Sequence, residues 1–258
     1  MLRCGMAGVD AVEARSDHVF PRHTHEQFGI GVILRGAQTS ASGRGMVEAE
    51  AGDVITVNPG EVHDGAPIGD GGRAWRMLYF EPALIADAAE DVGEGDPRAF
   101  EFTQPVMNDP RAAASFLQLF AAMTEADAPL RREELLLFLL DRMRERRRGN
   151  GPLPSTRISA ARTAIDDAPA ETRTLGELGG LCGLSRFQLL RGFAASTGFT
   201  PHAYLMQKRV DLARRLIARG TPLAEAAAVS GFADQSHMTR TFSRKYGLSP
   251  GAYAAALR

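Results

Sequence analysis

The sequence predicts an α+β protein of two domains: a β-rich N-terminal domain that ends in a pair of helices, and an all-α C-terminal domain. Three observations support this fold class. Residues 18–80 alternate apolar and polar side chains between frequent glycines, which is the period of strands. Beyond residue 157 the apolar residues recur every three or four positions, which is the period of helices. The stretch RRRGNGPLPST at 146–156 has the Gly and Pro content of a linker.

The N-terminal alternation predicts short strands separated by tight turns. Five segments carry the pattern: GIGVILRG, GAQTSASGRG, MVEAEAGD, DVITVNPG and RAWRMLYFEP. Many short strands with glycine-containing turns favour a barrel or a sandwich.

Two helices are expected after these strands. Residues 111–126 place Phe116, Phe120 and Met123 on one helical face, and residues 129–148 form the second helix. Residues 135–140 are apolar on all sides, so more than one face of this helix must be covered. We expect the barrel to cover one side and a second subunit the other, which predicts a homodimer. Burial wholly within one subunit is the alternative.

The net charge conceals two opposite halves. The chain has 30 basic and 31 acidic side chains, and the resulting net charge of −1 taken alone argues against a nucleic-acid partner. Divided after Thr156, residues 1–156 carry −8 and residues 157–258 carry +7. An Arg-rich half is the electrostatic footprint expected for phosphate binding, with a merely solvated basic surface as the alternative.

Composition also bounds the location of the protein. Cys4 and Cys182 are the only cysteines and do not make a disulfide framework, which favours a reducing cytoplasm. No apolar run reaches the roughly 18 residues that span a bilayer, and the first residues lack a secretory signal. We therefore expect a cytoplasmic protein with no membrane partner.

The basic half contains an internal repeat. Residues 179–204 and 227–253 match at an offset of 49, where among others Arg191, Phe193, Gly198, Pro201 and Tyr204 correspond to Arg240, Phe242, Gly247, Pro250 and Tyr253. Each copy has a turn glycine, Gly183 or Gly231, then an N-cap residue, Ser185 or Asp234, and then an amphipathic helix. A helix, a glycine turn and a second helix describe a helix-turn-helix.

A long helix is predicted between the two copies. Residues 201–220 begin with Pro and end with Gly, as helices often do, and would span roughly 28 Å. A rigid spacer of that size could hold two recognition helices about 34 Å apart, which is one turn of B-DNA.

At this point the sequence resembles a known family. Residues 157–258 resemble the DNA-binding domain of AraC/XylS-type transcription regulators, most specifically in GFADQSHMTRTFSRKYGLSPGAY. The resemblance implies recognition helices at about 185–196 and 234–246, with base-facing candidates Arg186, Phe187, Leu190, Arg191, Gln235, Ser236, His237 and Arg240. Arg can bind guanine and Gln can pair with adenine. Arg244 and Lys245 are expected to contact phosphates. The alternative for Phe187 is the helix core.

The histidines of the acidic half form a second pattern. His23-x-His25 followed by Gly36, and GDVITVNPGEVH ending at His63, resemble the two motifs of cupin barrels. His23 and His25 are two apart on an expected strand and so share a face. Metal-binding cupins carry a glutamate at the position that is Gly29 here, so the ligand set departs from the family pattern.

The cupin resemblance leaves three roles open for the histidines. His23, His25 and His63 could hold a divalent transition metal, line a pocket for an organic effector, or be structural. Trp75, Arg76 and Tyr79 are expected to be wall residues of that pocket. Arg76 could hold an effector carboxylate, or lie outside and pair with Glu48 or Glu50.

Together these patterns predict a one-component transcription regulator that is not an enzyme. Residues 1–148 would be a cupin-like effector-binding and dimerisation domain, 149–156 a linker, and 157–258 a domain that binds promoter DNA. The resemblance adds RNA polymerase as a possible partner and leaves activation or repression open. One alternative is a three-histidine metal enzyme, an oxygenase or isomerase, fused to a DNA-binding domain. Another is a constitutive DNA-binding protein whose barrel serves only assembly.

Overall fold

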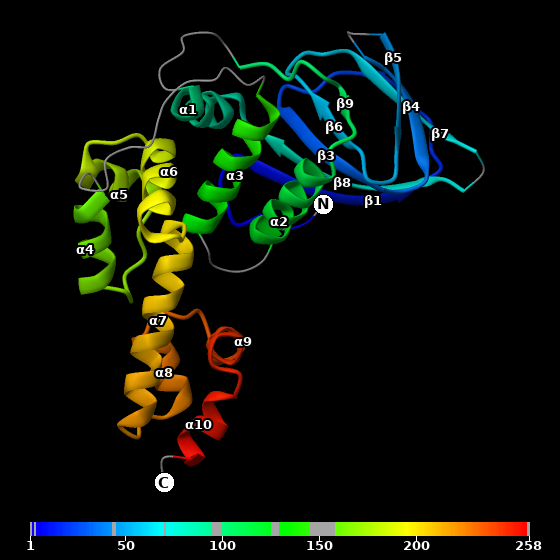
Figure 1. Cartoon of the computed structure of the whole chain (residues 1–258). Coiled ribbons are helices and arrows are strands. Elements are labelled where there is room, and N and C mark those ends of the chain that lie inside the picture. The colour runs from blue at the N-terminus through cyan, green and yellow to red at the C-terminus, as the bar shows by residue number, and fades with distance from the viewer. Residues whose placement is uncertain are drawn as a thin grey trace. The chain divides into compact units, whose positions relative to one another are not determined.

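A computed structural model describes residues 2, 4–42, 45–69, 71–93, 100–124, 129–144 and 158–256 (Figure 1). The chain divides into two compact units, Met1–Gly149 and Asn150–Arg258. The predicted linker at 149–156 lies outside the described residues, as do the last arginines of the segment 129–148. No helix in the described ranges is long and apolar enough to cross a membrane.

Two antiparallel sheets build the first unit. One has the strand order β1 (Val9–Ser16), β8 (Arg73–Phe80), β3 (Phe28–Arg35), β6 (Val54–Val57), β9 (Val106–Met107). The other has the order β2 (Phe20–His23), β7 (His63–Ile68), β4 (Ala37–Ser42), β5 (Gly45–Glu50). The five segments expected to be strands form β3, β4, β5, β6 and β8, which confirms the β-rich N-terminal domain.

Three helices complete the first unit. Helix α2 (Pro110–Thr124) packs on the five-stranded sheet, and α3 (Pro129–Met143) packs on both α2 and α1 (Pro82–Gly93) (Figure 1). The apolar residues of α3 are therefore largely covered within the subunit: Leu136, Leu137, Leu139 and Leu140 are buried. Phe138 remains 37% exposed. This agrees with the alternative that one subunit covers most of this helix.

The second unit consists of seven helices in the described part of the chain. They are α4 (Ser159–Asp167), α5 (Leu175–Cys182), α6 (Arg186–Thr197), α7 (Pro201–Ala218), α8 (Leu223–Val229), α9 (Gln235–Tyr246) and α10 (Pro250–Ala256). The pairs α5–α6 and α8–α9 are the two helix-turn-helix units, and α7 is the long helix between them (Figure 1). The structure thus has the predicted all-α architecture.

Local signals end and start these helices as expected. Gly183 ends α5 with φ +63°, and the Ser185 side chain accepts a hydrogen bond from the Gln188 backbone at the start of α6. In the second copy Gly231 has φ +79° and Asp234 caps α9 by accepting from His237 N–H. These conformations favour glycine at the turns and a short polar residue at the N-caps.

Helix α7 contributes to the cores of both helix-turn-helix pairs. Leu205 is buried on it, and further along Val210, Ala213 and Ile217 pack in one cluster with Phe242 of α9. Two Tyr–Asp–Lys clusters tie neighbouring helices to it: Tyr204, Lys208 and Asp166 at one end, and Tyr246, Lys245 and Asp211 at the other. A single helix therefore positions both helix-turn-helix units.

Candidate functional site

A cavity of about 340 Å³ lies in the first unit. Residues of β1, β2, β4, β5, β6, β7 and β8 line it, so both sheets contribute to its wall. Most of the lining is apolar or aromatic, including Val12, Phe20, Ile55, Trp75 and Met77. A largely apolar cavity of this size with a few polar groups is what small-molecule sites usually look like.

Strand β8 directs every second side chain into the cavity. Arg73, Trp75, Met77 and Tyr79 alternate along the strand and all line it. Trp75 and Tyr79 are therefore where the sequence predicted them.

The expectation that Arg76 is a wall residue is wrong. Because successive strand residues point to opposite faces, Arg76 lies on the outer face. Its Nε donates to Oε2 of Glu13 at 2.9 Å, and its guanidinium lies 5.0 Å from the ring centroid of Phe120 on α2. The alternative of an outside position is correct, with Glu13 as the partner instead of Glu48 or Glu50.

The three predicted histidines do come together at the cavity. The ring centroids of His23 and His63 are 4.4 Å apart, and that of His25 lies 4.9 Å from His23 and 5.1 Å from His63. His23 pairs with His63 across β2 and β7. His25 lies beyond the end of β2, so the expectation that it shares a strand with His23 is wrong although the rings still meet.

Backbone hydrogen bonds orient two of these rings. Nδ1 of His23 lies 2.7 Å from the Pro21 carbonyl oxygen, and Nδ1 of His63 lies 3.1 Å from that of Glu61. Because a carbonyl oxygen only accepts, Nδ1 carries a proton in both rings, and in the neutral tautomer Nε2 has a lone pair. Burial, together with the neighbouring histidines, lowers the pKa of both His25 and His63, which favours neutral imidazole.

The cluster has the donor chemistry of a three-nitrogen metal site. One ligand atom from each of His23, His25 and His63 lies within 4.8 Å of the others. No carboxylate completes the set at Gly29, where a Cβ would lie 3.2 Å from the Tyr79 ring. The Tyr79 ring itself lies 4.9 Å from that of His25 and fills this space, and burial raises the pKa of its hydroxyl.

Sequence reasoning missed the cation of the cavity, Arg73. Its side chain is enclosed (the residue is 2% exposed) and donates to Gln38 Oε1 at 2.8 Å and to the carbonyl oxygens of His18 and Gly65, each at 3.2 Å. Trp75 and Phe20 lie at 5.0 and 5.5 Å from its Cζ. The available signal was alternation, since Arg73 has the same parity as Trp75 and Tyr79.

The predicted base-facing residues of the second unit lie where a partner can reach them. Gln235, Ser236, Arg240 and Arg244 of α9 are exposed, and the last three are spaced four apart on one helical face. His237 is half-buried, with its ring 5.2 Å from that of Phe232. Lys245 is in an ion pair with Asp211 at 2.7 Å.

The first recognition helix differs from this pattern. Phe187 is 4% exposed and Leu190 is 0% exposed, so the expectation that they face bases is wrong. A buried side chain cannot reach a base edge, and these two residues extend the apolar face that includes Phe193. Arg186 and Arg191 are half-buried, and the Arg191 guanidinium lies 5.7 Å from the Phe187 ring.

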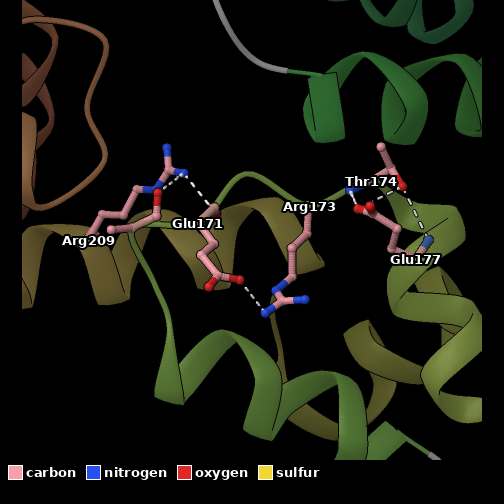
Figure 2. Close-up of polar contacts among 6 residues, drawn as sticks. Glu171, Arg173, Thr174, Glu177 and Arg209 are labelled. Atoms are coloured by element: carbon pink, nitrogen blue, oxygen red, sulfur yellow. Dashed lines mark hydrogen bonds and ion pairs between the residues drawn. The ribbon is translucent and has the colours of Figure 1, made fainter.

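Arg209 in the middle of α7 joins the two helix-turn-helix units and was not foreseen as a structural residue. It is 9% exposed and donates from Nε to the Pro169 carbonyl at 2.8 Å and from Nη2 to that of Glu171 at 3.2 Å. Figure 2 shows it reaching the loop before α5, where Thr174 and Glu177 cap that helix reciprocally. The turn of the second helix-turn-helix pair contacts the same loop before α5, because a Cβ on Gly231 would lie 2.6 Å from the Ala170 carbonyl oxygen.

Comparison with known protein families gives two matches. Residues 7–140 match a family described as AraC-like ligand binding domain, and residues 180–256 match one described as helix-turn-helix domain. The first match covers most of the unit with the cavity, and the second runs from the last residues of α5 to the end of α10.

Similar proteins have been described in several bacteria. The chain is 30% identical to the uncharacterised HTH-type transcriptional regulator YbfI of Bacillus subtilis, over 85% of this chain and 81% of that one. It is 40% identical to the probable transcriptional regulator LumQ of Photobacterium leiognathi over 33% of this chain and 35% of that one. A solved structure of ToxT from Vibrio cholerae is 12% identical, with 96% of this chain and 98% of that chain covered and a TM-score of 0.39.

Proposed function

This chain belongs to the AraC family of transcription regulators, and we propose that it acts as a one-component switch in which a small molecule in the N-terminal cavity alters promoter binding by the C-terminal unit. The observation that carries this proposal is the presence, in one chain, of a cavity of about 340 Å³ and two helix-turn-helix units. We assign residues 1–148 to effector binding and 157–258 to DNA binding, joined by 149–156.

DNA contact is proposed to centre on α9. Its exposed face offers a guanidinium at Arg240 that can bind guanine in the major groove and an amide at Gln235 that can pair with adenine. Arg244 lies one turn further and suits a phosphate. Helix α6 would contribute Arg186 and Arg191, with fewer exposed polar side chains than α9.

A ligand can change DNA affinity only by binding one arrangement of the protein better than another. The cavity is lined by both sheets of the first unit, so an occupant can bias their arrangement. The thermodynamic coupling must then be reciprocal: DNA must change the affinity for the effector by the same factor.

Selection of bound fragments from genomic DNA, followed by titration of the full chain with and without a small-molecule library, tests this proposal. We expect at least one compound to raise the unfolding temperature and to shift the apparent Kd for a selected fragment by 5-fold or more, as is typical of allosteric coupling. If compounds stabilise the protein and never change its DNA affinity, the switch is wrong and the barrel serves assembly.

Further partners follow from this proposal. We infer a homodimer because Phe138 on α3 leaves an aromatic side chain exposed between buried leucines. A promoter-bound regulator also meets RNA polymerase, and we place the protein in the cytoplasm with its DNA. An activity beyond regulation is not proposed, since the relatives are described as transcriptional regulators.

A second candidate role of the cavity is to bind a divalent transition metal through His23, His25 and His63. Supporting it are the lone pairs on Nε2 of His23 and His63, which their Nδ1 hydrogen bonds to backbone carbonyls leave available. Such outer hydrogen bonds orient metal-binding imidazoles in known sites. A bound ion would supply a Lewis-acid centre in the cavity, and imidazole nitrogens suit Zn, Cu, Fe or Ni.

Cobalt binding tests this role. Purified protein incubated with Co²⁺ and desalted should retain about one ion per chain, with visible absorption of a histidine-bound centre. His23→Ala should lose both signals. His18→Ala should keep them, because His18 is an exposed histidine outside the cluster. Equal retention in the two variants, or no retention in either, contradicts the metal site.

A further inference from the structure

Among the described residues that line the cavity, Arg73 supplies the one guanidinium, and it is buried. Its hydrogen-bond partners are the amide oxygen of Gln38 and two backbone carbonyl oxygens, all of them neutral. Within the described ranges no carboxylate pairs with it. Moving a charge from water into a protein interior is costly unless another charge or a strong hydrogen bond compensates it.

Arg73 has donors left over. A guanidinium carries five N–H groups, and the three hydrogen bonds occupy Nε–H and one N–H on each terminal nitrogen. One N–H therefore remains on Nη1 and one on Nη2. Two N–H groups are thus available for a carboxylate, which Arg commonly binds through two hydrogen bonds.

The acidic side chains of the lining are engaged elsewhere. Asp64 accepts from the Ala41 N–H at 2.6 Å and lies 3.8 Å from Arg22, while Glu61 accepts from both nitrogens of Asn58. Neither therefore neutralises Arg73. Beside the guanidinium the wall is aromatic, with Trp75 and Phe20, and it continues along β8 to Met77.

We propose that the effector is a small organic acid whose carboxylate binds Arg73 and whose apolar body lies against Phe20, Trp75 and Met77. This inference rests on the proposed effector role of the cavity and names the chemical class of its ligand. Arg73 also ties β4, β7 and the segment before β2 together through its three hydrogen bonds. A carboxylate bound to Arg73 would therefore contact the side chain that links these strands.

The chain contains its own reporter for this ligand. Trp75 is the only tryptophan, and its ring lies 5.0 Å from Cζ of Arg73. Its fluorescence can be followed while the full chain is titrated with phenylacetate, hexanoate and decanoate, each against its amide and its amine. At least one acid should bind, and at least tenfold more tightly than its amide, because a hydrogen bond to a charged group is worth more than one between neutral groups.

Variants separate a ligand contact from a structural role. Arg73→Gln should bring the ratio of acid to amide affinity close to one. Arg73→Lys, which keeps the charge without the fork, should lower that ratio in a protein that still folds. Arg76→Gln is the matched control, since Arg76 lies on the outer face of the same strand and should keep the wild-type ratio.

Several outcomes would overturn the inference. These are equal binding of acid and amide, preference for the amine, which would point to Asp64 or Glu61, and absence of binding by every acid tested. Should Arg73→Gln fail to fold, the wild-type series and Arg73→Lys still decide. A neutral compound that shifts DNA affinity would leave the regulatory function intact and refute the acid, whereas an acid that binds without affecting DNA would do the reverse.

Discussion

Gly231 in the turn of the second helix-turn-helix lies directly against Arg209 of the long helix α7. A Cβ built on Gly231 would lie 3.0 Å from Nε of Arg209 and 2.6 Å from the Ala170 carbonyl oxygen. Ala170 belongs to the loop before α5, whose neighbouring carbonyls accept hydrogen bonds from Arg209. The two DNA-binding units are therefore joined through one buried cation and one glycine.

This contact predicts unequal effects for two turn glycines. Gly183→Ala adds a side chain at φ +63° where nothing lies within 4 Å, so it should cost about 1–2 kcal/mol of unfolding free energy. Gly231→Ala meets a similar φ of +79° and in addition a backbone oxygen, so its cost should be larger. Urea unfolding of both variants measures the difference. A Gly231→Ala protein as stable as Gly183→Ala would show that the two units do not meet tightly there.

Replacing Arg209 should weaken the same junction without touching any predicted DNA contact. Arg209→Met leaves carbonyl oxygens of the loop without their donor, which should cost about 1–3 kcal/mol of stability. Binding to DNA with both half-sites should fall more than binding to a single half-site. The control is Arg215→Met, an exposed arginine of the same helix, which should change neither quantity. Equal loss on both DNAs would argue against a spacing role.

Arg240 and Arg244 of α9 should contribute to DNA binding in different ways. Arg240→Ala should lose about 1–3 kcal/mol of binding to the preferred site and relax selectivity at one base pair. Arg244→Ala should weaken specific and random DNA alike and reduce the salt dependence of binding. Competition binding at several salt concentrations separates the two. Parallel losses on both DNAs for Arg240→Ala would reassign it to the phosphate backbone.

Acid and base should weaken the link between α7 and α9 from opposite sides. Burial opposes ionisation of Asp211, but hydrogen bonds from Lys245 and Tyr246 outweigh it and lower the pKa of Asp211 below 3.8. The stability that the Asp211 carboxylate contributes is therefore fully present above pH 3.8 and is lost as the pH falls through the lowered pKa of the folded protein. Burial and Asp211 raise the pKa of Tyr246 from 10.0 to about 12, so its contribution is present below 10 and lost as pH rises through about 12.

Asp211→Asn tests this pair together with Tyr246→Phe. Each should lower the unfolding free energy at pH 7 by about 1 kcal/mol, a value discounted for partial exposure. The gap between wild type and Asp211→Asn should close as pH falls below the ordinary carboxyl pKa. Chemical unfolding from pH 2.5 to 7 measures it, and a gap independent of pH would refute the assignment.

Periodicity was enough to predict most elements of this fold. Alternation located β3 to β6 and β8, and the repeat located α6 and α9, because local patterns specify these elements. It could not say which face of β8 points inward, since that depends on register against β1 and β3. Once Trp75 and Tyr79 are placed in the wall, alternation places Arg73 there as well and Arg76 on the outer face.

The candidate site needed tertiary information for two further reasons. The histidines were identified as a cluster, yet the end of β2 before His25 could not be foreseen from spacing. On α6, Phe187 and Leu190 occupy positions at which exposed side chains could contact bases. Only the packing of the folded domain shows that they are buried. The contact of Gly231 with the distant Ala170 leaves no local signature at all.

The single helix between the two DNA-binding units also constrains the promoters that this protein can use. Helix α7 has 18 residues, about 27 Å, and cannot lengthen. Inserting one base pair between the half-sites shifts the second site by about 3.4 Å and rotates it by roughly 35° around the duplex. Operators can thus drift in sequence at many positions while the interval between their halves stays constant. A genome search for its targets should fix that interval first.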